Sequence, residues 1–165
     1  IPHHVLASAH EMVAAAGLRL ASLGYEVYRH PERLAAGAQD EVRRFLDGFA
    51  SLPGGGRIAL VGSGEVTLAH PNGAPPGGRC QHAALLAAER LAVLGGSTSF
   101  LACASDGVDG STDAAGAVVT GADAGPEADA ASRAFAAHAL LDRRGRLVHT
   151  GPTGTNVNDL WIALG

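Results

Sequence analysis

The chain has 165 residues, of which 47% are hydrophobic but only 4% are aromatic. This length holds one domain with a real core, or one domain plus part of another, and the core must be built mostly from Ala, Val and Leu. The formal net charge is −4, and the chain contains arginine but no lysine. We therefore expect neither nucleic acid nor an acidic membrane as a partner, and a P-loop lysine or a Schiff-base lysine is excluded within this chain.

Two cysteines, Cys80 and Cys103, are too few for a disulfide framework or a zinc site. No apolar run approaches the ~20 residues of a membrane span, and the N-terminal Ile-Pro-His-His lacks the pattern of a signal peptide. We therefore expect a cytoplasmic protein. The chain does not start with Met, which favours a start inside a longer reading frame.

The first third of the chain predicts the order strand, helix, strand, helix. These elements are a short apolar strand over Val5–Ser8, a helix over Glu11–Leu23, a strand over Tyr25–Tyr28 and an amphipathic helix over Gln39–Leu52. The run Pro53-Gly54-Gly55-Gly56 then marks the clearest boundary in the sequence.

Strands and helices continue to alternate after this boundary. The expected strands are Arg57–Val61 with Val66–Ala69 as its partner, then Thr98–Ala102 and Leu147–Thr150; the expected helices are Cys80–Leu94, a short one from about Asp113, and Ala128–Leu141, before Leu160–Leu164 closes the chain. This alternation predicts an α/β fold, a layered sandwich with a mixed, largely parallel sheet flanked by helices.

Four glycine-bearing segments lie at or shortly after the ends of expected strands, where α/β proteins place their ligands. They are Gly62-Ser63-Gly64-Glu65, Gly77-Gly78-Arg79, Ser105–Asp113 and Gly151–Asp159. Four such segments in about a hundred residues indicate one shared cleft edge. Arg79 is either a solvated side chain or, as we favour beside two glycines, a clamp for an anion.

The acidic segment SDGVDGSTD carries Asp106 and Asp109 on one short glycine loop. Two carboxylates so close repel one another unless a cation or hydrogen-bond donors relieve them, so a Mg²⁺ site is one interpretation. The other is a tight turn in which Ser111 or Thr112 caps the helix expected from Asp113.

The segment GPTGTNVND brings glycine backbone and neutral donors together. Gly151 and Gly154 let backbone N–H groups converge, and Thr153, Thr155 and Asn156 add side-chain donors. This composition favours an oxyanion site without a formal charge. A structural turn, whose Asn and Asp satisfy the local backbone, is the alternative. The eight histidines show no metal-ligand spacing, and no His/Asp partnership activates Cys80.

Together these motifs resemble the MOFRL type of the glycerate 2-kinase family, whose members are often described as hydroxypyruvate reductases. SDGVDGSTDAAGAVV resembles the family's acidic loop, HTGPTGTNVNDLWIAL resembles its closing segment, and SGEVTL and GGRCQHAAL resemble two further motifs in the same order. The resemblance places a MOFRL domain at residues 57–165 and makes residues 1–56 the end of the preceding glycerate kinase domain. No GxGxxG fingerprint is present, which argues against hydride transfer.

The resemblance implies ATP-dependent phosphorylation of D-glycerate to 2-phosphoglycerate in a cleft between two domains, with ATP and Mg²⁺. Arg79 and Asp109 would be catalytic, with Asp106 and Asp109 near the metal. The substrate and phosphate contacts would be Gly64, Glu65, Gly77, Gly78, Asp106, Gly107, Thr153, Gly154, Thr155 and Asn156. The N-terminal glycerate kinase domain is the implied partner, so we expect this chain alone to be inactive; a homo-oligomer stays open.

Three polar positions depart from the family's pattern. Cys80 replaces an amide, His82 replaces a carboxylate, and Ala9 stands where Asn is usual. These changes leave an alternative function open, that of a non-catalytic module which binds small anionic metabolites or a partner chain.

Overall fold

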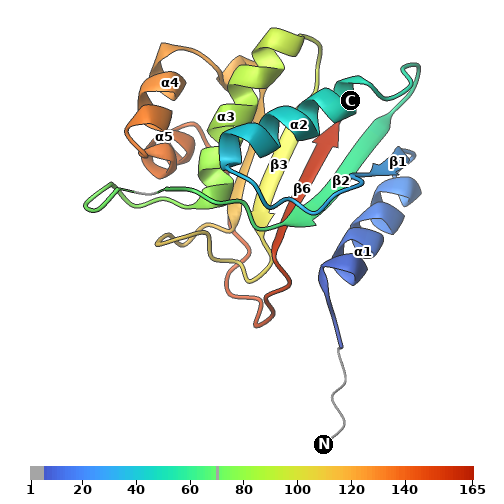
Figure 1. Cartoon of the computed structure of the whole chain (residues 1–165), viewed down its shortest axis with the longest axis horizontal. Coiled ribbons are helices and arrows are strands. Elements are labelled where there is room, and N and C mark those ends of the chain that lie inside the picture. Colours follow the sequence, from blue (N-terminus) through green and yellow to red (C-terminus); the bar gives the residue numbers. More distant parts are fainter. Residues whose placement is uncertain (1–5, 70) are drawn as a thin grey trace, which may run out of the picture.

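The computed structural model describes residues 6–69 and 71–165. Its sheet has six strands in the order β1-β2-β6-β3-β4-β5, with helices on both faces (Figure 1). The strands are β1 (Glu26–Arg29), β2 (Ile58–Gly64), β3 (Ser99–Ala104), β4 (Gly116–Thr120), β5 (Leu147–Val148) and β6 (Asp159–Leu164). The helices are α1 (Ala9–Ser22), α2 (Ala38–Ala50), α3 (Arg79–Leu94), the 3-10 turn η1 (Gly121–Asp123), α4 (Pro126–Arg133) and α5 (Ala137–Arg143).

The sheet is mixed, as expected, but it is not largely parallel. Only β1 and β2 run parallel; β2–β6, β6–β3, β3–β4 and β4–β5 are antiparallel pairs. The last strand, β6, inserts between β2 and β3 and runs against both. The mixed sheet is thus confirmed, and only the expectation that it is largely parallel was wrong, because alternating helices and strands do not reveal where the closing strand inserts.

The main core lies between the sheet and the helices α2 and α3. Phe45 of α2 packs edge-on against Trp161 of β6, with ring centroids 5.7 Å apart, and Phe100 of β3 packs edge-on against the same indole at 5.3 Å. All three side chains are fully buried. On the opposite face, α1 buries Leu20 against Ala59 and Val61 of β2. Figure 1 shows α1 separated from the other helices by the sheet.

Several expected elements differ from the structure. Leu6–Ser8 is not a strand, since Ser8 instead caps α1 by accepting the backbone N–H of His10; Val5 lies outside the described residues. Val66–Ala69 forms only an isolated bridge, between Thr67 and Gly37.

The segment after the acidic loop also differs from the sequence-based expectation. The helix expected from Asp113 is absent, and the strand β4 begins at Gly116 in its place. The single helix expected over Ala128–Leu141 is two helices, α4 and α5, with Phe135 between them at a φ of 54°.

The segments on both sides of Pro53–Gly56 share one sheet and one core. β1, which precedes these residues, pairs with β2, which follows them. Val42, Phe45 and Leu46 of α2 belong to the same buried cluster as residues of α3 and β3. The division at residues 56 and 57 stays a prediction about the family's domains. Across residues 6–69 and 71–165, no helix has the length and apolar character needed to cross a membrane.

Candidate functional site

The expected glycine segments meet at one end of the central strands β2, β6 and β3. The strand register aligns Gly64 at the end of β2 with Asp159 at the start of β6, and Asp159 with Ala104 at the end of β3. Since these three residues are lateral neighbours, the segments that follow β2 and β3 and precede β6 leave the sheet at the same place. Figure 1 shows the last two of these segments projecting together below the sheet.

Arg79 is the first residue of α3 and lies between two carboxylates at this end of the strands. Its Nη1 donates to Oε1 of Glu65 at 2.7 Å, and its Nε lies 3.7 Å from Oδ2 of Asp159. Two adjacent hollows share Arg79 as a wall: one of about 530 Å³ that includes Arg33 and Glu65, and one of about 350 Å³ that includes Gly77, Gly78, Gly110 and Ser111. The sequence-predicted residues Glu65, Gly77, Gly78 and Arg79 are thus brought together.

Asp109 anchors the N-terminus of α3. Its Oδ1 accepts the backbone N–H of Cys80 at 3.0 Å and its Oδ2 accepts that of Gln81 at 2.8 Å. The side chain is buried; burial raises the pKa of the Asp109 carboxyl, opposed by these two N–H donors. Asp109 therefore does not take the expected position facing a cleft. It also occupies the place where a helix N-terminus would bind an external anion.

Asp159 was not among the predicted site residues, although it ends the GPTGTNVND motif. Burial, the first cause, raises the pKa of this carboxyl to about 6; Arg79 opposes the shift and the charge of Asp109 adds to it. Its Oδ2 accepts no hydrogen bond within the described residues. A carboxylate at the start of a buried apolar strand is the sequence signal that could have identified it.

The two thiols are protonated at neutral pH. Burial, together with the charge of Asp109, holds the pKa of Cys80 well above its usual range, and burial raises that of Cys103 to about 11. A protonated thiol is a poor nucleophile, so the structure gives no support to a reactive Cys80. Cys80 also packs beside Asp159, where an amide would be a stronger hydrogen-bond donor.

The segment before β6 is tied to the acidic loop. The Thr153 hydroxyl donates to the Ser105 carbonyl at 2.6 Å and its backbone N–H donates to the Asp106 carbonyl at 2.9 Å. Nδ2 of Asn156 donates to Oδ2 of Asp106 at 3.0 Å. Thr153, Asn156 and the half-buried Asp106 therefore hold two loops together. Gly154 and Thr155, which lie between Thr153 and Asn156 in the sequence, are exposed to solvent.

Three of the predicted binding glycines allow close backbone contacts. A Cβ on Gly64 would lie 2.1 Å from the Leu34 carbonyl oxygen, and one on Gly78 would lie 2.2 Å from Cγ of Asp109. Gly107 has a φ of +86°, and a Cβ there would lie 2.0 Å from the Gly151 carbonyl oxygen. These positions need glycine for packing, whatever they bind.

The carboxylates do not fit the expected magnesium site. Both oxygens of Asp109 accept backbone N–H groups, while Oδ1 of Asp106 accepts from Val108 and its Oδ2 from Asn156. In the described parts of the chain, no group of three or more His, Cys, Asp or Glu side chains is arranged to hold a metal ion. Hydrogen-bond donors, the second option for relieving the repulsion, thus hold both carboxylates.

The other two departures from the family's pattern have structural settings. His82 is buried in α3 and stacks on Phe135, with ring centroids 5.2 Å apart. Ala9 is the first residue of α1, where Ser8 already supplies the cap. Neither residue lines the two hollows beside Arg79.

Loops that meet at the ends of neighbouring strands beside a hollow are a common place for small ligands in α/β domains. Residues 58–159 match the MOFRL family. The chain belongs to this family.

Two curated relatives are glycerate kinases by name. The chain is 41% identical to D-glycerate 2-kinase of Thermotoga maritima over an alignment of 112 residues, and the match covers 64% of this chain and 26% of that protein. It is 34% identical to glycerate 2-kinase of Pyrococcus horikoshii over an alignment of 113 residues, and the match covers 65% of this chain and 25% of that protein.

Two crystal structures have the same fold. A Pyrococcus horikoshii protein superposes with a TM-score of 0.84 at 28% identity, over 99% of this chain and 40% of its own. Glycerate kinase from Thermotoga maritima superposes with a TM-score of 0.84 at 29% identity, over 98% of this chain and 41% of its own. The chain thus spans about two fifths of these structures and matches about a quarter of the curated relatives.

Proposed function

We propose that this chain is the C-terminal part of an ATP-dependent D-glycerate 2-kinase and forms one wall of an interdomain cleft. The observation that carries the proposal is the position of Arg79, at the start of α3 between Glu65 and Asp159, as the shared wall of two adjacent hollows. The reaction is inferred from the names of the relatives. The second wall of the cleft is inferred from their greater length, because this chain covers only part of each.

In this proposal Arg79 binds the glycerate carboxylate or the transferred phosphoryl group. Phosphoryl transfer depends mainly on positioning and on charge neutralisation, and a guanidinium with free N–H groups supplies both. Because Nη1 of Arg79 already donates to Glu65, the substrate oxyanion either uses the remaining N–H groups or displaces this exposed carboxylate.

The neighbouring elements hold Arg79 and shape the wall. Asp109 fixes the first turn of α3, from which Arg79 projects, through two backbone N–H groups. Gly77 and Gly78 line the adjacent hollow. The exposed backbone of Gly154 offers an N–H group for a second oxyanion, whereas the N–H of Thr155 already donates to Oγ1 of Thr153 at 3.3 Å. The nucleotide-binding loop and any lysine come from the other part of the enzyme in this proposal, because this chain has no lysine.

A chimera tests the proposal directly. This chain would replace the region of the Thermotoga maritima enzyme on which it superposes, and phosphorylation of D-glycerate by ATP would be followed. We expect activity in the chimera, a loss of at least about a hundredfold on Arg79→Ala, and no activity of residues 1–165 alone. A folded chimera without activity, or robust turnover by the chain alone, would contradict the proposal.

The alternative function, a non-catalytic module for small anions, is favoured by one observation. Beside Asp159, the protonated thiol of Cys80 stands where the family's pattern has an amide, which is a stronger hydrogen-bond donor. Calorimetry of this chain with D-glycerate, 2-phosphoglycerate and ATP distinguishes the two functions when it is read beside the chimera. Binding of an anion together with an inactive but folded chimera would favour the module.

A further inference from the structure

The charges at the Arg79 wall do not favour an anion on their own. Arg79 is shared between Glu65 at 2.7 Å and Asp159 at 3.7 Å, so this group carries no net positive charge at neutral pH. An external oxyanion that met only Arg79 would compete with two carboxylates already in place. The proposed substrate is anionic, and a second cation at the same hollow would resolve this competition.

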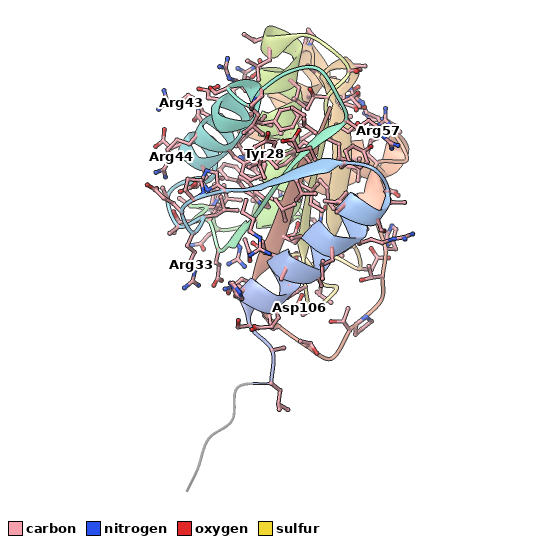
Figure 2. All side chains as sticks on the ribbon, turned by 90° about the vertical axis from the view of Figure 1, so that its right-hand side faces the viewer. Tyr28, Arg33, Arg43, Arg44, Arg57 and Asp106 are labelled. Atoms are coloured by element: carbon pink, nitrogen blue, oxygen red, sulfur yellow. The ribbon has the colours of Figure 1, made fainter. Side chains whose placement is uncertain are left out.

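Arg33 is that second cation. It lines the hollow of about 530 Å³ together with Glu65 and Arg79. Across residues 6–69 and 71–165, no carboxylate forms an ion pair with Arg33, whereas Arg43 and Arg44 on the neighbouring helix α2 are both paired. Figure 2 shows Arg33 on the same side of the molecule as Arg43 and Arg44, nearer to the end where Asp106 lies.

The backbone that carries Arg33 is fixed against the end of β2. The N–H of Leu34 donates to the Ser63 carbonyl at 3.2 Å, and the Leu34 carbonyl accepts the N–H of Glu65 at 2.8 Å. Leu34 itself is fully buried. These bonds join the Arg33 side of the hollow to the Glu65 side, so their separation is set by the sheet.

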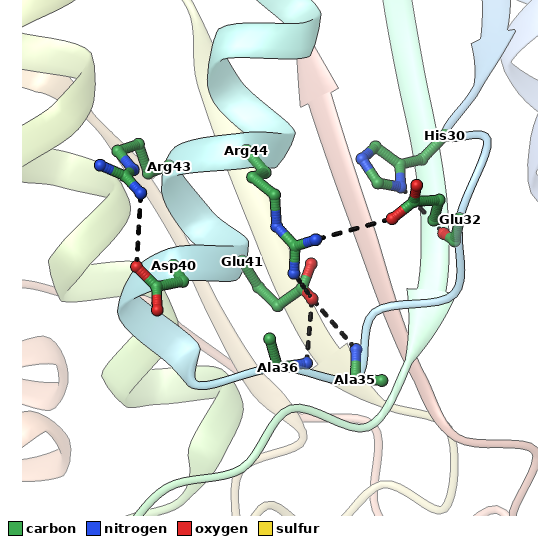
Figure 3. A network of polar contacts seen from close by, with 8 residues as sticks. All are labelled: His30, Glu32, Ala35, Ala36, Asp40, Glu41, Arg43 and Arg44. Carbon is green, nitrogen blue, oxygen red and sulfur yellow. Dashed lines mark hydrogen bonds and ion pairs between the residues drawn. The ribbon is translucent and has the colours of Figure 1, made fainter.

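Glu41 holds the two residues that follow Leu34. Its buried carboxylate accepts the N–H of Ala35 at 3.2 Å and that of Ala36 at 2.9 Å, and it pairs with Arg44 (Figure 3). The side chain of Glu41 is only 3% exposed. On the other side of Arg33, the N–H of His30 donates to the Val61 carbonyl at 2.8 Å. The short segment that carries Arg33 is therefore held at both ends, which lowers the entropic cost of binding a ligand.

We propose that Arg33 is a second anion-binding residue of the Arg79 wall and supplies the net positive charge that the bound oxyanion requires. The ligand is a carboxylate or phosphate group that contacts both guanidinium groups. This inference rests on the proposed function for the identity of the substrate, but not for the existence of the anion site. Arg33 lies in no glycine motif, so the sequence alone does not single it out.

The test is a titration of the folded chain with inorganic phosphate, D-glycerate and 2-phosphoglycerate, for the wild type, Arg33→Gln and Arg29→Gln. Arg29 is the matched control, since it is another exposed arginine four residues away that does not line this hollow. We expect Arg33→Gln to weaken 2-phosphoglycerate binding by about tenfold or more, and Arg29→Gln by less than about twofold. Wild-type affinity should also fall as salt rises, because the contact is between charges.

The outcomes separate this inference from the proposed function. Equal affinity of Arg33→Gln and Arg29→Gln overturns the role of Arg33, as does the absence of anion binding by the wild-type chain at millimolar concentration. In the chimera, an active enzyme whose KM for D-glycerate is unchanged by Arg33→Gln supports the proposed function and overturns the inference. An inactive chimera whose anion affinity still depends on Arg33 supports the inference and contradicts the proposed function.

Discussion

The carboxylate of Asp109 holds the backbone N–H groups of Cys80 and Gln81 at 3.0 and 2.8 Å, across 29 and 28 positions of sequence. This contact joins the acidic loop to the first turn of α3, where the two N–H groups have no partner within the helix. It also fixes the helix end that carries Arg79. The same carboxylate therefore stabilises the fold and positions the candidate site.

Asp109→Ala should destabilise the chain by about 2–4 kcal/mol, because it leaves two buried N–H groups without an acceptor. Urea unfolding measures this change. Asp113→Ala is the control, because the Asp113 side chain in the same loop is 83% exposed; it should change stability by less than about 0.5 kcal/mol. Equal effects of the two substitutions would show that Asp109 does not anchor α3.

Gly78→Ala should be poorly tolerated and Gly77→Ala well tolerated. A Cβ at position 78 would lie 2.2 Å from Cγ of Asp109, whereas the nearest atom to a Cβ at position 77 is the Phe135 carbonyl oxygen at 3.5 Å. We expect a loss of at least about 2 kcal/mol for the first substitution, because the loop must move. Urea unfolding of both variants decides, and a Gly78→Ala variant as stable as Gly77→Ala would contradict the packing.

Asp159 should make stability depend on pH. Its pKa is raised from 3.8 to about 6 by burial, so between about pH 4 and pH 6 the folded chain keeps a proton that the unfolded chain has lost. Stability from this group is fully present below about pH 4 and is lost as the pH rises through about 6, on the order of 2–3 kcal/mol in all.

Asp159→Asn tests this dependence, because the amide stays neutral at every pH. Relative to the wild type, the variant should gain stability between pH 4 and pH 7, as followed by urea unfolding at several pH values. Asp113→Asn, an exposed control in the acidic loop, should show no such trend. A difference between Asp159→Asn and the wild type that does not change with pH would exclude a raised pKa at Asp159.

The acidic loop shows where sequence reasoning succeeded and where it stopped. Repulsion between Asp106 and Asp109 correctly indicated that something must relieve their charges. One donor is local, since the N–H of Val108 donates to Asp106, but the N–H groups of α3 and the Asn156 amide lie 28 to 50 positions away. A contact at that separation depends on the tertiary fold, which local spacing does not encode.

The strand β4 was missed for a related reason. The run Asp113-Ala-Ala-Gly-Ala is rich in alanine, and local propensity therefore favours a helix. In the structure Gly116 lies against β3, where a Cβ would be 1.9 Å from the Ala102 carbonyl oxygen. Tertiary pairing outweighs the propensity. The long amphipathic helix α2 was predicted closely, because its burial pattern follows directly from its own sequence.

Glu41→Ala should reduce both stability and anion affinity. Removing this buried carboxylate frees the N–H groups of Ala35 and Ala36 and leaves Arg44 without its closer partner, at a cost of about 2–4 kcal/mol. Asp40→Ala is the adjacent control, since Asp40 is exposed and its ion pair is with the exposed Arg43. Urea unfolding compares the two variants, and a cost for Glu41→Ala no greater than for Asp40→Ala would contradict the role of Glu41.

Substitution of Glu41 should also weaken anion binding by the chain that remains folded, beyond any loss caused by unfolded molecules. Below the unfolding transition, Glu41→Ala should weaken binding of 2-phosphoglycerate, because the backbone that presents Arg33 is no longer held at Ala35 and Ala36. Glu41→Gln keeps one oxygen that accepts these N–H groups, so it should retain more of the affinity than Glu41→Ala does. If the two variants bind equally, the segment is held by Leu34 and β2 alone, and the carboxylate of Glu41 serves only stability.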